Sequence, residues 1–370
     1  MALTVAIFGT NGGTSFSSYG FDNALTRIGM NTGNAVFQFA LWKMVANSKL
    51  TVEPGMTAKY IRDNAQHILI PAANQVNAAW DMSWLADMLE HCNLPVTCIG
   101  LGAQAETDND PYLDLKPGTV RYLKVLSERT SRIGLRGPFT QEVLEHFGVT
   151  NTVITGCPSQ TINPHLKGAA IQAQLNSARQ MSRPSVGYVL GTLEANTRLA
   201  ERMLAQQIAP LPHQLILQTD PRLLRVIYDR QVPQDDAAYV KWVQGVMRPD
   251  LNTCAFIDYF LQHAVFYSDA RSWIDAMRRH DVVLGMRIHG AVAAIQAGKL
   301  GVCVTFDSRT KELAETMGYP YLPIERIAKD QTLAQMLEHV IFDADRFDAA
   351  RAHNTATIRD ILQKDGLTLS

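Results

Sequence analysis

Short apolar segments rich in β-branched residues recur along the chain and alternate with stretches that have the spacing of amphipathic helices. Because these segments are apolar throughout, rather than at every second position, they predict parallel strands covered by helices on both faces. The predicted strands are LTVAIFG, HILIP, VTCIG and SRIGL, followed by SVGYVLGT, HQLILQ, AVFYS, DVVLGM and GVCVTF. The pattern therefore indicates an α/β fold.

The alternation pauses once, between residues 160 and 183, where a polar helical stretch separates two series of strands. We expect residues 1–165 to form one doubly wound, Rossmann-like domain and residues 183–330 to form a second, with a cleft between them. Residues 331–370 are predicted to be helices that pack back on the first domain. A chain of 370 residues is long enough for two such domains.

Composition and charge exclude several classes of protein. The 34 Lys and Arg are balanced by 35 Asp and Glu, so the chain lacks the basic field of a nucleic-acid-binding protein. Five scattered cysteines without a CxxC pair argue against a disulfide framework and a thiolate metal site, and favour the reducing cytoplasm. No apolar run reaches the ~18 residues of a membrane span. We expect a soluble cytoplasmic protein without a metal or transmembrane segment. The sequence leaves open whether the protein works at the inner face of the membrane.

Candidate chemical groups are sought directly after the predicted strands, where ligands bind in open parallel sheets. Arg136 follows SRIGL and precedes a helix, a position suited to an anion or to an ion pair with a carboxylate. DVVLGMRIHG places Arg287 and His289 in the turn before a small-residue helix, and FDSRTKELAETMG brings Arg309 and Lys311 into another. Arginine binds carboxylate or phosphate, and histidine exchanges protons near neutral pH. The alternative for His289 is a structural role, and the alternative for Arg309 and Lys311 is a solvated, charged first turn of the helix.

Two further segments supply candidates for substrate contact. NTGNAVFQFALWKM is a polar helix entry in which Asn31 and Asn34 either cap the helix or contact a ligand. Gly100 and Gly102 end the strand of VTCIGLGAQ, where missing side chains admit a ligand to the backbone or allow close packing. The loop GTNGGTSFSSYG after the first strand lacks the GxGxxG spacing of a dinucleotide site, so a tight turn is the simpler interpretation.

Taken together, these segments resemble the polysaccharide pyruvyltransferase family, whose members are built like the two-domain glycosyltransferases of the B type. The resemblance spans about residues 30–320 and rests on NTGN, GLGAQ, SRIGLRGPFTQEVLEHFGV, GCPS, MRIHGAVAAIQAG and FDSRTKELAETMG, in this order. Its most specific part is Arg-x-His followed by small residues and then Asp-x-x-x-Lys. Asn34 stands where relatives often carry Asp, and Cys157-Pro158-Ser159 where many have Asp-Pro.

The resemblance implies a transferase that moves the pyruvyl group of phosphoenolpyruvate onto a sugar of an extracellular or capsular polysaccharide precursor. The product would be a cyclic ketal, and phosphate would be released without a metal or other cofactor. His289 would shuttle protons, and Arg136, Arg287 and Lys311 would hold the donor, whose carboxylate and phosphate suit arginine. The first domain would face the glycan acceptor and the second the donor; whether the acceptor is lipid-linked stays open.

Two other functions remain open from the sequence. A nucleotide-sugar-dependent glycosyltransferase of the B type would use the same two-domain cleft, with Arg287 and Lys311 on a diphosphate. A non-catalytic glycan-binding protein would need aromatic platforms but no proton-transfer group. Trp80 and Trp84 are candidates for such a platform, although aromatic residues four positions apart more often pack into a core.

Overall fold

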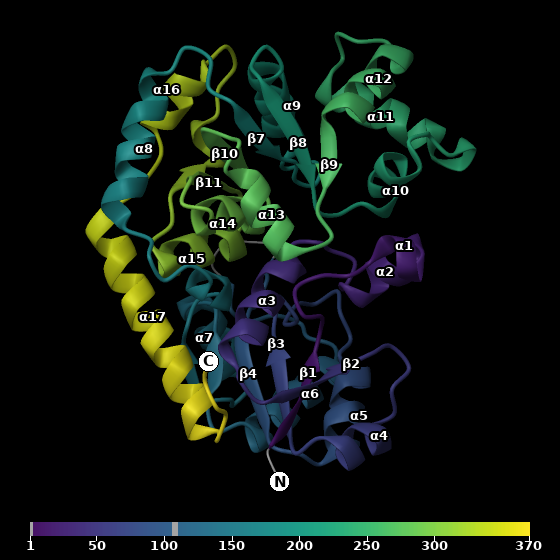
Figure 1. Ribbon diagram of the computed structural model, residues 1–370, viewed down its shortest axis with the longest axis vertical. Helices are drawn as coiled ribbons and strands as arrows, with labels where there is room; N and C mark the ends of the chain where they lie inside the picture. Colours follow the sequence, from purple (N-terminus) through teal and green to yellow (C-terminus); the bar gives the residue numbers. More distant parts are fainter. Residues whose placement is uncertain (1–2, 106–109) are drawn as a thin grey trace.

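The computed structural model describes residues 3–105 and 110–370, which form two lobes, each built on a six-stranded parallel sheet (Figure 1). The strands of the first sheet are β1 (Thr4–Phe8), β2 (Ser48–Val52), β3 (His67–Pro71), β4 (Val96–Leu101), β5 (Ile133–Leu135) and β6 (Thr152–Ile154). Their spatial order is β2-β1-β3-β4-β5-β6. The direction of winding therefore reverses between β1 and β3, which is where a doubly wound sheet opens a crevice for a ligand.

The second sheet repeats this design. Its strands are β7 (Val186–Val189), β8 (His213–Leu217), β9 (Ala264–Phe266), β10 (Val282–Gly285), β11 (Leu300–Thr305) and β12 (Tyr321–Pro323). The order β12-β11-β10-β7-β8-β9 reverses between β7 and β10. Both halves are thus Rossmann-like, and the predicted α/β fold with two doubly wound domains is confirmed.

Helices connect the strands and cover both sheets (Figure 1). Those of the first half are α1 (Phe16–Tyr19), α2 (Phe21–Arg27), α3 (Asn34–Met44), α4 (Ala58–Asn64), α5 (Ser83–Cys92), α6 (Pro117–Arg129) and α7 (Pro138–His146). Those that follow are α8 (Gly168–Gln180), α9 (Arg198–Ile208), α10 (Pro221–Asp229), α11 (Ala237–Met247), α12 (Thr253–His263), α13 (Ala270–Met277), α14 (Ile288–Gln296), α15 (Ser308–Met317), α16 (Leu333–Glu338) and α17 (Ala344–Lys364). In the described part of the chain, none of them is both long and apolar enough to cross a membrane.

The strands that the hydrophobic pattern predicts are all present, and the three that it misses lie at sheet edges. These are β2, β6 and β12, whose residues are mostly only half-buried. An edge strand is covered less completely than a central one, so its sequence lacks the continuous apolar run.

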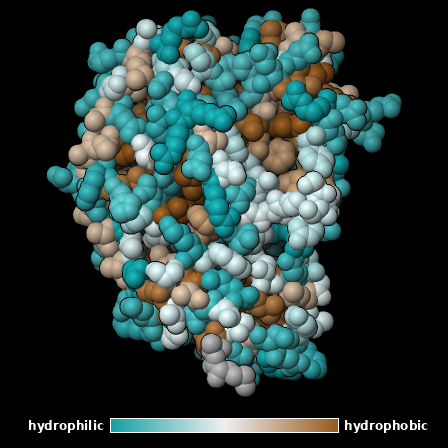
Figure 2. Space-filling model, viewed as in Figure 1, coloured by the Kyte–Doolittle hydropathy of each residue, from teal (hydrophilic) through white to brown (hydrophobic). Residues whose placement is uncertain are grey.

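Hydrophilic residues cover most of the face shown in Figure 2, with smaller hydrophobic patches between them.

The last helix, α17, runs along one side of the molecule and contacts both lobes (Figure 1). Its upper part packs against α8, and its lower part lies on the first sheet. There Ile358, Ile361 and Leu362 join Val5 and Ile99 in one buried cluster. The C-terminal segment therefore packs back across the first domain.

Candidate active site

A cavity of about 800 Å³ lies at the carboxyl ends of both sheets, where the two domains face each other. The first domain contributes Asn74, from the loop after β3, and Arg136, which directly follows β5. The second contributes Thr219 after β8, Arg287 after β10 and Arg309 at the start of α15. Residues that follow strands of both sheets thus line one space.

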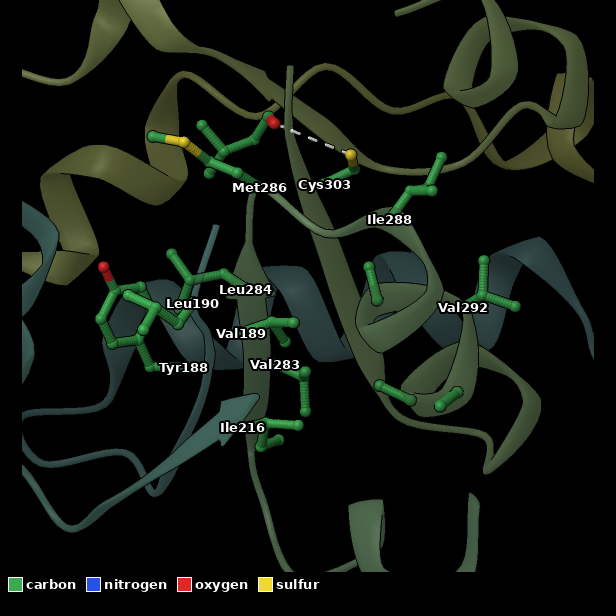
Figure 3. Close-up of a cluster of buried hydrophobic side chains, with 14 of the residues drawn as sticks. Tyr188, Val189, Leu190, Ile216, Val283, Leu284, Met286, Ile288, Val292 and Cys303 are labelled. Carbon is green, nitrogen blue, oxygen red and sulfur yellow. Dashed lines mark hydrogen bonds between the residues drawn. The ribbon is translucent and has the colours of Figure 1, made fainter. Parts of the chain in front are cut away.

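The turn after β10 explains why an apolar strand ends in polar residues. Gly285 has φ +154°, and a Cβ there would lie 2.0 Å from the carbonyl oxygen of Val189, so only glycine fits. Met286 and Ile288 then turn into the core beside β7 and β10 (Figure 3). All four residues from Met286 to His289 border the cavity, and Arg287 and His289 supply its polar groups there. Arg287 is the N-cap of α14 and His289 belongs to its first turn, so the helix begins earlier than the sequence predicts.

Arg136 is buried, with 4% of its surface exposed, and is held by groups of its own domain. Its Nε donates to the Gly100 carbonyl oxygen at 2.9 Å, and its Nη1 donates to Asn74 Oδ1 at 2.5 Å. A Cβ on Gly102 would lie 2.7 Å from both Arg136 Cδ and Asn74 Oδ1. Gly102 is therefore needed to make room for the arginine. The structure supports the packing interpretation for both glycines, because Gly100 lies against Pro158 and neither is among the cavity-lining residues.

Arg287 and Arg309 approach from the second domain. Arg287 Nη2 donates to Thr219 Oγ1 at 2.8 Å, and burial, followed by the charge of Arg309, lowers the pKa of Arg287 to about 10. Arg309 forms an ion pair with Asp307, with 3.1 Å between Nη2 and Oδ2. We call Arg136, Arg287 and Arg309 the arginine triad.

Each member of the triad keeps one buried nitrogen free. Arg136 Nη2, Arg287 Nε and Arg309 Nε are enclosed, yet have no hydrogen-bond partner within residues 3–105 and 110–370. Leaving a buried donor unsatisfied costs about 1 to 3 kcal/mol, and more for a charged group. The three arginines that carry these donors line the same cavity from both domains, and an anion with several oxygen atoms would offer acceptors to such cations.

His289 lies among the triad and is buried, with 7% of its surface exposed. Its Nε2 is 3.6 Å from Cys157 Sγ, which also accepts a hydrogen bond from Ser159 Oγ at 2.9 Å. Phe37 covers the imidazole, with 5.4 Å between ring centroids. Burial, followed by the charges of Arg136, Arg309 and Arg287, lowers the pKa of His289 to about 3. The free protein therefore holds a neutral imidazole, and an anion on the triad would raise its pKa again.

A buried carboxylate fixes the domain contact behind the triad. Glu312 of α15 accepts hydrogen bonds from the backbone N–H and the hydroxyl of Thr140, at 2.8 and 3.1 Å, in the first turn of α7. A Cβ on Gly137 would come within 2.3 Å of Glu312. The helix start after Arg136 is thus docked directly on the helix that carries Arg309.

The structure departs from the sequence prediction at Lys311. Its side chain is exposed on α15 and is not among the residues that line the cavity. Arg309, two positions earlier, lies in the cavity instead. The helix start follows from the capping box between Asp307 and Thr310, which fixes which side chains of the first turn face inward.

Asn31 and Asn34 both line the cavity, but neither caps α3. Asn31 Oδ1 accepts from the N–H of Gly33 at 2.8 Å, and Asn34 Nδ2 donates to the Ile28 carbonyl oxygen at 3.0 Å. Both bonds lie within the loop, and the Thr32 N–H, which donates to the Gln218 carbonyl oxygen at 2.9 Å, attaches the loop to the end of β8. The loop thus belongs to the cavity wall.

Sequence reasoning did not select several residues that contact the triad or His289. Asn74 and Thr219 each bind an arginine, and Cys157 contacts His289. Asn74 and Thr219 follow the predicted strands HILIP and HQLILQ within a few residues. Their place after a strand was therefore a usable signal, whereas the contact of Cys157 depends on the packing of two distant segments.

Comparison with known proteins gives one family. A model described as polysaccharide pyruvyl transferase matches residues 16–308. Among solved structures, UDP-N-acetylglucosamine 2-epimerase from Rickettsia bellii is similar over 99% of this chain and 98% of its own, with 10% identity and a TM-score of 0.47. UDP-GlcNAc 2-epimerase from Neisseria meningitidis is similar over 98% and 99%, with 9% identity and a TM-score of 0.43. No curated protein matches the chain significantly.

Proposed function

Because the chain belongs to the polysaccharide pyruvyl transferase family, we propose that it transfers the pyruvyl group of phosphoenolpyruvate to two hydroxyls of a glycan. The product is a cyclic ketal, and phosphate leaves. The observation that carries this proposal is the arginine triad around His289, with one unsatisfied buried nitrogen on each guanidinium. Phosphoenolpyruvate has a carboxylate and a phosphate on a three-carbon frame, so it offers acceptors for all three donors.

The charges of the site supply a way to control proton transfer. Without a ligand, burial and then the charges of the triad lower the pKa of His289 to about 3, so the imidazole is neutral. A bound polyanion offsets these cations and favours the imidazolium form. The donor thereby generates the acid that its own reaction needs. Cys157 engages Nε2, which leaves Nδ1 for proton exchange with the ligand.

The reaction then proceeds in two additions at C2 of the donor. The His289 imidazolium protonates the methylene carbon, which becomes a methyl group, and a sugar hydroxyl adds to the electrophilic C2. The neutral imidazole accepts the proton of that hydroxyl. The bond between C2 and the phosphate oxygen breaks, and the second hydroxyl adds to C2 while its proton leaves with phosphate. The triad holds the carboxylate and stabilises the leaving phosphate.

The proposal predicts that phosphoenolpyruvate raises the unfolding midpoint of the protein and that UDP does not. A ligand that binds only the folded state at 100 times its Kd stabilises by about 2.7 kcal/mol, which a thermal-shift measurement detects. Arg287→Ala should lose about half of the shift or more, whereas Lys311→Ala, with its exposed side chain, should retain it. A larger shift with UDP or GDP than with phosphoenolpyruvate would favour a nucleotide-sugar glycosyltransferase instead.

A further inference from the structure

A second group of cavity-lining side chains differs in chemistry from the arginine triad. Trp80, Trp84 and Met88 follow one another at intervals of four residues, in the loop before α5 and along that helix, and all three line the cavity. Trp84 and Met88 share one face of α5, and Trp80 lies in the loop that leads into this helix. Another side of α5, which includes Ala86 and Leu89, is buried in the first domain. We call Trp80, Trp84 and Met88 the tryptophan shelf.

The two indoles of the shelf are unusually free. Trp80 is 51% exposed and Trp84 57% exposed. The other three tryptophans have partners: Lys49 lies over Trp42, Tyr239 stacks on Trp242, and Tyr267 stacks on Trp273. Single exposed aromatic residues need no explanation, but two on the wall of one cavity indicate a ligand surface. Of the two alternatives that the sequence leaves open for this pair, a platform or packing into a core, the structure excludes the core, because both indoles are more than half exposed.

The backbone beneath the shelf is fixed, so the exposure of the rings is built into the fold. Lys116 Nζ donates to the Ala79 carbonyl oxygen at 2.9 Å, and Thr119 Oγ1 donates to the Trp80 carbonyl oxygen at 2.8 Å. Both donors belong to α6 or the residue that caps it, and α6 packs against α5. A rigid aromatic surface loses little conformational freedom when a ligand covers it.

The charge of the cavity is divided unevenly. Among the described residues that line it, the charged side chains are the arginine triad and the ion pair of Arg27 with Glu53. The triad is the anion site, whereas the ion pair is neutral and offers both donors and acceptors. A ligand on the shelf therefore needs apolar faces and hydroxyl groups rather than charge.

We propose that the tryptophan shelf binds a neutral pyranose ring of the acceptor glycan. One face of a pyranose carries C–H groups that pack on indole rings, and its hydroxyls both donate to and accept from groups such as Glu53 and Arg27. This inference rests on the proposed function, since it assigns the second substrate to the same cavity. It makes Trp80 and Trp84 binding residues for the sugar that receives the pyruvyl group or for its neighbour in the glycan.

Saturation-transfer NMR with the methyl pyranosides of glucose, galactose and mannose tests the shelf directly. At about 10 mM, a ligand of millimolar affinity occupies most sites. At least one pyranoside should receive magnetisation, mainly at its ring C–H protons. Trp84→Ala and Trp80→Ala should each lower its affinity at least tenfold. Trp242→Ala, which removes an exposed tryptophan outside this cavity, should leave the signal unchanged.

The inference would be overturned by no response from any of the three pyranosides, by an unchanged response in Trp84→Ala, or by an equal loss in Trp242→Ala. Displacement of the pyranoside by uridine alone would assign the shelf to a nucleobase and also overturn it. The thermal shift with phosphoenolpyruvate, measured on the same variants, separates this inference from the proposed function. Failure of the donor to stabilise the wild-type protein would contradict pyruvyl transfer, while a Trp84-dependent pyranoside signal would leave the sugar site standing.

Discussion

The His289→Gln variant is expected to turn over about 10²- to 10⁴-fold more slowly than the wild-type protein while still binding phosphoenolpyruvate. Glutamine has a similar polar reach but cannot carry a proton between the sugar hydroxyl and the donor methylene. The arginine triad is untouched, so donor affinity should change little. Turnover is measured as phosphate release in the presence of the acceptor glycan, and binding as the thermal shift with the donor.

If His289 is purely structural, its replacement should affect stability and leave turnover unchanged. His289 packs against Phe37 and Cys157, so its loss would then lower the unfolding midpoint, and the molecules that remain folded would turn over normally. Turnover per folded molecule distinguishes the two roles. Near-normal turnover would remove His289 from the mechanism. Cys157→Ala tests the orientation of the ring separately, because it removes the contact to Nε2 without removing the imidazole.

Arg136→Ala and Arg287→Ala should each weaken donor binding by roughly ten- to hundredfold, since losing a hydrogen bond to a charged group costs about 1.5 to 3 kcal/mol. The effects should not simply add, because both cations act on one ligand and on the same histidine. Titration with phosphoenolpyruvate gives the Kd of each variant. Removing either cation should also raise the pKa of His289 in the free protein.

The matched control for the triad is Lys311→Ala, which removes a positive charge from the same helix as Arg309 but outside the cavity. Its donor affinity should stay within about twofold of the wild-type value, because salt screens an exposed charge outside the cavity. Equal losses in Lys311→Ala and Arg287→Ala would mean that general electrostatic attraction, rather than direct contact, governs donor binding.

The sequence predicts the central strands because each is buried on both faces and therefore apolar throughout. β2, β6 and β12 escape this criterion because each pairs with only one neighbour and is partly exposed. The fold class, the two-domain division and the place of the crevice all follow from the central strands alone. Edge strands extend the sheets without moving the crevice.

Part of the cavity could also be located from the sequence, because the central strands that lead to it can be recognised there. Arg136 and Arg287 directly follow predicted strands, so their place at the carboxyl ends of the sheets is fixed by topology. Topology does not decide between Arg309 and Lys311, because both follow the same strand. Only the exact start of the helix determines which side chain faces inward. The contact between Cys157 and His289 joins positions 132 residues apart, and no local pattern contains it.

Calorimetric titration of the protein with phosphoenolpyruvate near neutral pH, repeated in buffers of different ionisation heat, tests the link between donor binding and His289 most directly. In the free protein the pKa of His289 is about 3, so the imidazole is neutral. If the bound donor raises this pKa toward or above neutrality, binding must be accompanied by uptake of a substantial fraction of one proton. The uptake should disappear in His289→Gln while binding persists. Binding without proton uptake, or the same uptake in His289→Gln, would contradict a donor-generated imidazolium as the acid of the reaction.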